Sequence, residues 1–439
     1  MLSRYLLLSF ALLLFNTKAN AQIDTIKILS YNTLNYDEVS GSCPDNLNYK
    51  KYKYMRDIFK YTDPDIIGLE KMNLVPIFVE DSIPAFVLDS LCNGCWDHST
   101  LTYNSGYGKC NLLYFKKSKF GMSSTKSIYS ADGNISDIDL IQLYYKDSSL
   151  LTTKDTIFLN IIIVHDKSGG SSSSQRGTEI SGAMAWLDAH IHKLTNYIFM
   201  GDFNVTGSAE PCFQAMIAPA NKNLDFNEPT GALGSWSSFP SNFGKYLTQS
   251  TRTADLPDCG ASGGITNWFD HILCSDFIMK GTDAFTYVPN SFTVIGQDGN
   301  HVNKAIIDPP TNTSAPAYII NDIYHMSEHF PISLQLAINP AHRYVGIEEV
   351  NKASEIENIA VNYYNGRLNI INNNQDLVGK EAHLEIYNLL GKNLFDKKIK
   401  IDNSASSIDI SFLPEGCYVI VLQDGNSYVS RSKIVKTDY

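Results

Sequence analysis

The sequence predicts an α/β layered domain followed by a small antiparallel β-sandwich domain. Two observations carry this prediction. From residue 23 to about residue 339, short apolar strands alternate with helical or loop segments, an order typical of layered α/β domains with buried strands. From about residue 355 onward, period-two alternation is broken by Gly and Asn turns and no helical periodicity intervenes, which indicates antiparallel strands.

The elements of the first domain follow from its apolar spacing. Apolar residues three to four apart predict helices at 55–62 and at roughly 178–194. Residues 196–204 are apolar on both faces, which predicts a buried strand. The strands are expected at 26–31, 65–70, 111–117, 157–165, 196–204, 268–275 and 330–338. Long loops at 205–265 and 289–328 are expected to carry function, because long loops in compact domains often do.

Residues 1–21 have the pattern of a signal peptide. Arg4 gives a positive start, and the apolar run 5–15 is too short to span a membrane. Ala19-Asn20-Ala21 fits the small-x-small cleavage pattern. No later stretch reaches about 18 consecutive apolar residues, so we expect no transmembrane segment in the mature chain.

Composition excludes several classes of protein. The chain has 439 residues, and 44% of them are hydrophobic, which excludes a disordered chain. With 35 Lys and Arg against 46 Asp and Glu, the formal net charge is −11. This balance argues against a protein that holds nucleic acid by bulk charge alone. A nucleic-acid enzyme stays possible, because a bound cation supplies positive charge locally.

The eight cysteines permit disulfides in an exported chain. Cys92 and Cys95 have the spacing of a redox motif, but they enclose Asn-Gly, a turn signal, so we interpret the pair as structural. Cys212 follows the Gly-Asp-Phe-Asn strand, and Cys259 precedes the Phe-Asp-His strand. If these strands are neighbours their loops meet, so we predict a Cys212–Cys259 disulfide, worth roughly 4 kcal/mol.

Polar side chains suited to metal and phosphate chemistry stand where the predicted strands end. They are Asn32, Glu70, His165, Asp202, Asn204, Asp270, Glu328 and His329. Strand ends in α/β sheets commonly form the active face. Carboxylates, amides and histidines without a nucleophilic Ser or Cys suit hydrolysis assisted by a hard cation, in which a carboxylate activates water.

Each of these residues also has a structural interpretation. Asn32 alone is more often a turn or cap residue, Glu70 the start of a solvated loop, and His165 a packed or surface histidine. An Asx-turn accounts for Asp202 and Asn204 in roughly half of random cases. The joint order of all of them along the chain, each at a strand end, favours a common site.

That order resembles the endonuclease/exonuclease/phosphatase superfamily, the DNase-I-like enzymes. The matching stretches are LSYNTLNY, DIIGLEKMN, VHDKSG followed by an arginine, FMGDFNV, FDHIL and SEHFP. KYLTQSTR, GGITNWFDHIL and GQDGNHVNK are similar to secreted bacterial members. The resemblance implies a four-layered DNase-I-like sandwich, two packed mixed β-sheets flanked by helices, with residues 22–338 as the catalytic domain.

The resemblance also implies a site for Mg²⁺ or Mn²⁺. Asn32 and Glu70 would hold the cation, with Glu328 as a further metal ligand. Glu328 stands where the usual motif has Asp, and its side chain is one methylene longer. Leu69 stands where Gln commonly precedes the metal-binding Glu, which removes a polar supporting group.

The remaining residues would carry the catalytic steps. By the same resemblance, Asp202 would position or deprotonate the attacking water, and Asn204 would bind the phosphate. His329, oriented by Asp270, would bind phosphate in the transition state. His165 would contact the phosphate or the leaving group.

The end of the chain resembles a type A sorting domain of type IX secretion. The matching stretches are RLNII, LEIYNLLGK, IDISFLPEGCYVIVL and SKIVK. This implies a sorting domain over 356–439 after a linker at 339–355, with the type IX secretion machinery as partner. A carbohydrate- or surface-binding β-module is the alternative. The resemblance implies a Gram-negative bacterium and a secreted or cell-surface location.

We therefore expect a secreted divalent-metal-dependent phosphoesterase. The leading hypothesis is a nuclease that hydrolyses extracellular DNA or RNA, with Arg176 and Arg252 contacting the substrate. One alternative is a phosphatase or phospholipid phosphodiesterase of the same superfamily. Another is a catalytically inactive surface-binding protein, a hypothesis motivated by the replacement at Glu328.

Overall fold

The structure, a computed structural model, divides the chain into two compact units, Met1–Tyr344 and Val345–Tyr439. The expected signal peptide at 1–21 and nearly all of the expected linker at 339–355 lie outside the described residues. The described residues are 24–38, 43–74, 79–102, 108–130, 137–147, 150, 156–191, 193–340, 342, 359–364, 366–372, 378–388, 392–402, 405–424 and 427–436.

The first sheet of the N-terminal unit has seven strands in the order β11-β13-β1-β2-β4-β3, with β12 paired to β13. β1 and β2 run parallel, and the other neighbours are antiparallel. The strands are β1 (Asp24–Tyr36), β2 (Ile66–Asn73), β3 (Trp96–His98), β4 (Lys109–Lys116), β11 (Phe285–Tyr287), β12 (Thr293–Val294) and β13 (Ile332–Ile338).

The second sheet has six strands in the order β5-β6-β7-β8-β10-β9. β7 and β8 run parallel, and the remaining neighbours are antiparallel. The strands are β5 (Phe120–Tyr129), β6 (Ile138–Tyr145), β7 (Ile157–His165), β8 (Tyr197–Asp202), β9 (Phe226–Asn227) and β10 (Asp270–Ser275). Each sheet thus has one parallel pair near its middle.

The two sheets pack face to face around one apolar core. The central strands β1 and β2 contact β7, β8 and β10 of the other sheet. Gly68 on β2 is needed for this close approach, because a Cβ there would lie 2.3 Å from Cε of Met200 on β8. The core is built from the apolar strand residues that the sequence displays as near-continuous runs.

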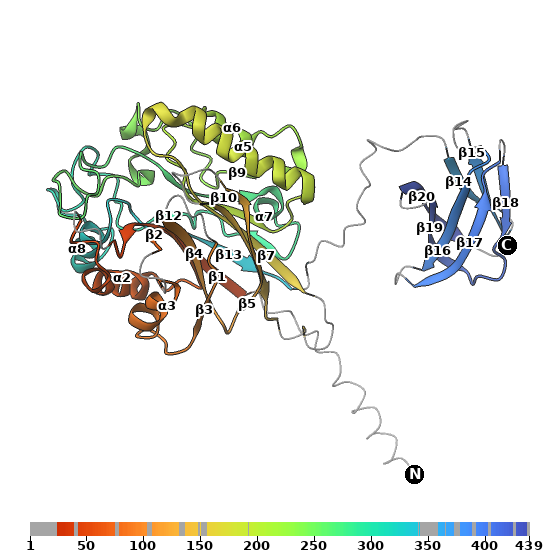
Figure 1. Cartoon of the computed structure of the whole chain (residues 1–439), viewed down its shortest axis with the longest axis horizontal. Coiled ribbons are helices and arrows are strands. Elements are labelled where there is room, and N and C mark those ends of the chain that lie inside the picture. The colour runs from red at the N-terminus through yellow and green to blue at the C-terminus, as the bar shows by residue number, and fades with distance from the viewer. Residues whose placement is uncertain are drawn as a thin grey trace, which may run out of the picture. The chain divides into compact units, whose positions relative to one another are not determined.

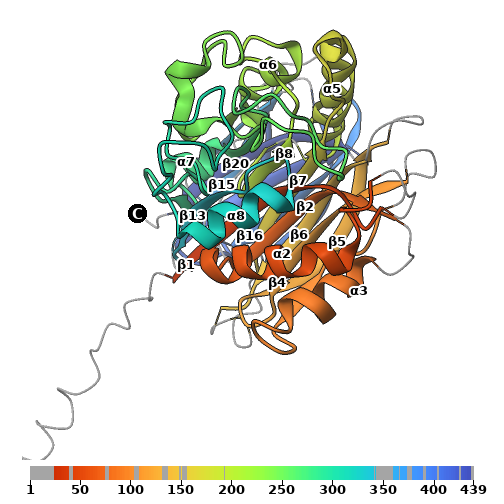
Figure 2. The ribbon, with the colours of Figure 1, turned by 90° about the vertical axis from the view of Figure 1, so that its left-hand side faces the viewer.

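Helices cover the two outer faces. Figure 1 shows α5 and α6 along one side of the unit and α2, α3 and α8 along the other, and Figure 2 shows the same layers from the side. The helices are α2 (Asn48–Thr62), α3 (Val79–Ile83), α5 (Ser173–His190), α6 (Pro211–Ile217), α7 (Asp276–Lys280) and α8 (Ala317–Met326). Shorter turns are η1 (Pro84–Leu88), η2 (Gly170–Ser172), η3 (Lys222–Leu224) and η4 (Pro240–Tyr246). The four layers confirm the predicted sandwich.

The structure extends several predicted elements. β1 continues to Tyr36, beyond the predicted end at residue 31, and α5 begins at Ser173 rather than near 178. β5 was not predicted, because its middle is polar and half-exposed and lacks an apolar run. Within the described part of the chain, no helix combines the length and apolar character needed to span a bilayer.

The predicted Cys212–Cys259 disulfide is wrong. Cys259 bonds to Cys43, with 5.4 Å between their Cα atoms, and Cys212 is a buried free thiol on α6. The strands that motivated the prediction, β8 and β10, are indeed neighbours. However, the Cys259 loop packs against the chain after β1, where Asp45 N–H donates to the Pro257 carbonyl. Cys92 and Cys95 form a second disulfide.

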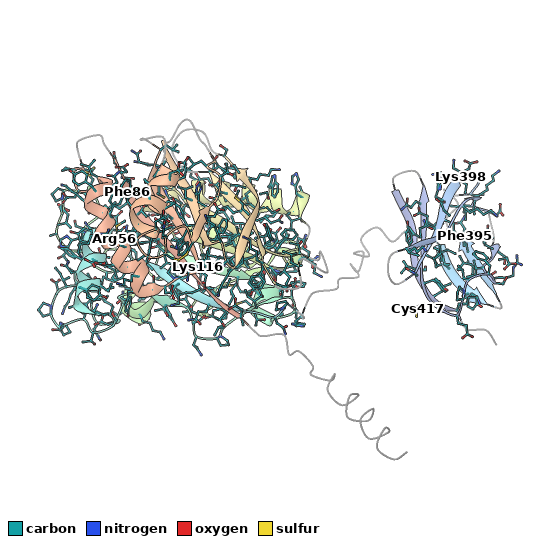
Figure 3. The ribbon with its side chains drawn as sticks, turned by 90° about the horizontal axis from the view of Figure 1, so that it is seen from below. Arg56, Phe86, Lys116, Phe395, Lys398 and Cys417 are labelled. Atoms are coloured by element: carbon teal, nitrogen blue, oxygen red, sulfur yellow. A yellow bond between two sulfur atoms is a disulfide. The ribbon has the colours of Figure 1, made fainter. Side chains whose placement is uncertain are left out.

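The C-terminal unit consists of two small antiparallel sheets, as predicted. Three strands pair in the order β14-β15-β18 and four in the order β17-β16-β19-β20. Figure 3 labels Phe395 and Lys398 on β17 and Cys417 on β19. An apolar core of its own joins the sheets. The strands are β14 (Ile359–Tyr364), β15 (Arg367–Asn372), β16 (Glu381–Asn388), β17 (Asn393–Lys400), β18 (Ala405–Asp409), β19 (Gly416–Asp424) and β20 (Ser427–Lys436).

Candidate active site

Strand register brings the predicted residues to the same end of the two sheets. Asn32 on β1 is the parallel partner of Glu70 on β2. In the other sheet, His165 on β7 is the parallel partner of Asp202 on β8, which also faces Asp270 across the antiparallel pair with β10. Polar residues therefore stand at the end of the β7–β8 pairing and at the end of the regular part of the β1–β2 pairing, before its register shifts.

A hydrogen bond from Asn32 joins the two sheets at this end. Nδ2 of Asn32 donates to Oδ2 of Asp202 at 2.8 Å and lies 3.4 Å from Nε2 of His329. All three side chains are buried. The Asn32 amide thus sets the distance between the first-sheet and second-sheet halves of the site.

His329 forms a pair with Asp270. Its Nδ1 donates to Oδ2 of Asp270 at 2.8 Å, which leaves Nε2 facing Asp202 at 3.6 Å. Burial opposes protonation of His329, but the carboxylates of Asp270 and Asp202 outweigh it and raise its pKa to about 9. The imidazole is therefore a cation at neutral pH.

Asp202 is placed by a backbone that only glycine allows. Gly201 has φ +133°, and a Cβ there would lie 2.0 Å from the Val164 carbonyl oxygen. Oδ1 of Asp202 accepts the backbone N–H of Asn204 at 2.9 Å, the Asx-turn expected from sequence. Burial raises the pKa of Asp202 to about 6, against the opposing effect of His329. Asn204 donates its side-chain amide to the Asp166 carbonyl at 3.0 Å.

Glu70 is fully buried and only half satisfied. Its Oε1 accepts from the Ser30 hydroxyl at 2.6 Å, whereas Oε2 has no hydrogen-bond partner among the residues that the structure describes. Burial is the main cause of a pKa well above the usual range, and the negative charges of Asp270 and Asp202 add to it. A buried carboxylate oxygen without a partner is costly unless something positive binds it.

The donor set fits a hard divalent cation. Carboxylate oxygens of Asp202 and Asp270 and a ring nitrogen of His329 lie within 4.8 Å of one another. Because His329 is protonated at neutral pH, the two carboxylates are the ligands that this group offers to a cation. Within the described part of the chain, Oδ1 of Asp270 is, like Oε2 of Glu70, a buried oxygen without a hydrogen-bond partner. Carboxylate oxygens of this kind are what Mg²⁺ and Mn²⁺ prefer.

His165 lies at the second-sheet edge of the cluster. Its Nε2 is 3.8 Å from Oδ2 of Asp202. Burial is the main cause of a pKa well below the usual value, and the charge of Lys71 lowers it further. His165 is therefore neutral at physiological pH, in contrast to His329.

Glu328, the expected third metal ligand, has other partners. One carboxylate oxygen accepts the backbone N–H of Ala261, and the other lies 3.4 Å from Nζ of Lys71. That second oxygen is also 3.8 Å from Nε2 of His329. Glu328 thus borders the cluster, but its charge is matched by an ammonium group.

The two arginines expected to bind substrate are buried in internal contacts. Arg176 donates to Glu210 and to the carbonyls of Lys167 and Gly169. These contacts hold the turn that follows His165. Arg252 is paired with Asp258. Neither guanidinium is exposed, so we assign the two arginines structural roles rather than contact with substrate.

Sequence reasoning missed three residues of the site. Ser30 was detectable, because it stands two residues before Asn32 on β1 and so points to the same face. Gln249, whose amide nitrogen lies 3.0 Å from Nε2 of His329, lies in the KYLTQSTR stretch, which sequence reasoning noted without giving Gln249 a role. Lys71 directly follows Glu70. In a regular strand its side chain would point to the face opposite that of Glu70, away from the site.

Comparison with known proteins gives a clear match for the C-terminal unit. Residues 358–437 match the family described as the secretion system C-terminal sorting domain. This match confirms the sorting domain predicted from the sequence. A search of curated protein sequences found no match for the chain.

Solved structures with similar folds cover most of the chain. The human Nocturnin catalytic domain with bound sulfate anion is 12% identical, with 72% of this chain and 98% of that chain covered and a TM-score of 0.40. TDP2 from Caenorhabditis elegans is 14% identical, covering 71% and 75%, with a TM-score of 0.42. An endonuclease/exonuclease/phosphatase from Beutenbergia cavernae is 10% identical, covering 94% and 100%, with a TM-score of 0.36.

The N-terminal unit carries a buried cluster of Asp202, Asp270 and His329 at the ends of its two packed mixed sheets. The function of this unit is therefore inferred from the geometry of that cluster. Residues 358–437 match the family described as the secretion system C-terminal sorting domain.

Proposed function

We propose that the chain is an exported, divalent-metal-dependent phosphoesterase, and specifically a nuclease that hydrolyses phosphodiester bonds of extracellular DNA or RNA. The observation that carries this proposal is the buried cluster of Asp202, Asp270 and His329, with unpartnered oxygens on Asp270 and Glu70. Such a cluster costs stability unless a ligand compensates it, which is typical of a functional site.

Glu70 and Asp270 would hold Mg²⁺ or Mn²⁺ through their buried oxygens, with Asn32 fixing the position of Asp202 beside it. When bound, the cation would neutralise negative charge on the phosphoryl oxygens and lower the barrier to attack by water. Bringing a phosphate into a pocket with three carboxylates is unfavourable without it.

The side chains divide the proton chemistry between them. Asp202, deprotonated above pH 6, would accept the proton of the attacking water. The cationic His329, held at Nδ1 by Asp270, would present Nε2–H to a phosphate oxygen. Neutral His165 would contact a phosphate oxygen or the leaving group. Asn204 would add its second amide hydrogen.

A local gathering of lysines favours a polyanionic substrate. The positive charges of Lys71, Lys167 and Lys109 all depress the pKa of His165, although Lys71 is paired with Glu328 and Lys109 with Glu38. All three side chains are partly exposed. In a chain with a net charge of −11, these local positive charges favour attraction of nucleic acid to the site.

The test is hydrolysis by the purified chain of plasmid DNA, RNA, a phosphomonoester and sphingomyelin, each with Mg²⁺ and with EDTA. We expect Mg²⁺-dependent cleavage of DNA or RNA that His329→Ala abolishes. His190→Ala is the matched control, because His190 is an exposed histidine at the end of α5. Cleavage of only the lipid or the monoester would replace the nuclease by those activities. No turnover of any substrate by the folded protein would refute the phosphoesterase proposal.

A further inference from the structure

We propose that Lys71 binds a phosphate oxygen of the substrate at the mouth of the site, and that Glu328 positions its ammonium group. This inference rests on the proposed phosphoesterase function and names the residue that captures the substrate's anionic group. It also gives Glu328 a role other than metal ligation.

The backbone at Lys71 is bent so that the side chain reaches the site. In a regular strand, successive side chains point to opposite faces, so Lys71 would point away from Glu70. Lys71 instead has φ +59°. The pairing of β2 with β4 shifts register between Leu69 and Met72. A bulge of this kind re-aims a side chain and is common beside active sites.

A left-handed conformation is unfavourable for lysine. Residues other than glycine rarely adopt positive φ, and those that do are mostly Asn, Asp or His. Such strain persists only where surrounding structure imposes it, and it gathers at functional sites. Here the conformation places Nζ of Lys71 at 3.4 Å from Oε1 of Glu328, which lies 3.8 Å from Nε2 of His329.

Lys71 differs from the cluster in its exposure. Its side chain is 20% exposed, whereas those of Asp202 and His329 are 2% exposed. The ammonium group can therefore meet an incoming ligand before the ligand reaches the buried centre. The positive charge of Lys71 acts inside the site, because it is, after burial, the next largest cause of the lowered pKa of His165.

Glu328 has the contacts of a positioning residue. The Ala261 N–H binds one carboxylate oxygen, which fixes the side chain and leaves the other oxygen for Lys71. The loop around Ala261 is itself held by the Cys43–Cys259 disulfide two residues earlier. The Lys71 ammonium group is thus held beside the site by Glu328, which is held in turn by the Ala261 N–H.

The test measures binding of a single-stranded phosphorothioate octanucleotide by calorimetry, in Mg²⁺, for the full chain and its variants. Lys71→Asn removes the charge but keeps a residue tolerant of positive φ, and Lys71→Arg keeps the charge. We expect Lys71→Asn to weaken binding about tenfold and to reduce the salt slope by about 0.7. Lys71→Arg should restore most of both. Lys222→Asn, an exposed lysine on η3, should match the wild type.

Glu328 is tested by a double-mutant cycle on the same ligand. If Glu328 acts through Lys71, Glu328→Gln weakens binding in the wild-type background and has no further effect in Lys71→Asn. In hydrolysis assays, Lys71→Asn should raise KM more than it lowers kcat. An additive cycle would overturn the positioning role.

The inference and the proposed function fail in different ways. Binding that depends on Lys71 without hydrolysis of any substrate would support the inference and refute the enzyme. Undiminished binding by folded Lys71→Asn, or no binding by the wild type, would overturn the inference. Separate hydrolysis assays would then show whether the chain is a phosphoesterase.

Discussion

Nδ1 of His329 donates a hydrogen bond to Oδ2 of Asp270 at 2.8 Å, and both side chains are almost completely buried. Asp270 begins β10 of the second sheet, whereas His329 lies three residues before the start of β13 of the first. The carboxylate therefore fixes the imidazole across the sheet interface and raises its affinity for a proton. Asp270 is the largest of the carboxylate contributions that keep His329 protonated, and Asp202 adds to it.

The first prediction concerns the pH profile of hydrolysis. Activity needs deprotonated Asp202, so it rises through pH 6 or below, because a bound cation lowers that pKa further. Activity also needs protonated His329, so it falls above about pH 9. Asp270→Asn removes the stabilising charge, and we expect the alkaline limb of kcat/KM to move to lower pH. A profile whose alkaline limb does not move would contradict this assignment.

The second prediction concerns the stability of the metal-free protein. Glu70 has a folded-state pKa above its unfolded value. Its protonated form therefore contributes stability that is fully present below about pH 4.5 and is lost as pH rises through the folded pKa. Added Mg²⁺ should compensate the ionised form, so it should raise the Tm more at pH 8 than at pH 5.

Glu70→Gln provides the matched variant for that measurement. The neutral amide should raise the Tm in EDTA, because it removes a buried charge, and should abolish most of the stabilisation by Mg²⁺. Thermal unfolding with and without EDTA measures both effects. An equal Mg²⁺ shift in wild type and variant would show that Glu70 is not a ligand.

The third prediction contrasts the two buried arginines. Arg176→Met removes the donors that hold the turn after His165 and leaves Glu210 without its cation, so we expect a loss of about 3 kcal/mol in unfolding free energy. Arg252→Met should cost less, because Lys51 lies 3.7 Å from Asp258 and still opposes its charge. Urea unfolding of both variants gives the comparison, and equal losses would contradict it.

The fourth prediction concerns the disulfides. Cys43–Cys259 spans 216 residues and Cys92–Cys95 spans three. In the chain-entropy treatment the first is worth about 5 kcal/mol and the second about 2 kcal/mol. Replacing both cysteines of each pair by serine should lower the Tm much more for the long loop. Peptide mapping without reductant should find Cys212 as a free thiol.

The strand ends of the site could be predicted because burial leaves a strong trace in sequence. The run before Asp202 and the run before His165 are apolar on both faces, so their ends and the polar residues there are visible. Parallel register then brings them together without further information. The fold follows largely from the same runs. β5 was missed because its middle is polar, and β6 was also missed, although its sequence is apolar and mostly buried.

Other parts of the site depend on the whole fold. The bulge at Lys71 reflects pairing with two neighbouring strands, and no lysine-specific signal announces positive φ. Gln249 reaches His329 from a long loop, and Cys43 meets Cys259 across 216 residues of chain. Contacts of this kind are set by loop packing, for which strand periodicity gives no information.

The hydrogen bond from Asn32 to Asp202 has a consequence for assembly of the protein. Asn32 and Glu70 come from one sheet, and Asp202 and Asp270 come from the other, so neither sheet alone carries a complete set of ligands. A folding intermediate with two formed but undocked sheets would be inactive. Separate fragments bearing one sheet each could recover activity only by reassociation. The rate at which hydrolysis recovers during refolding would therefore report the rate at which the two sheets dock.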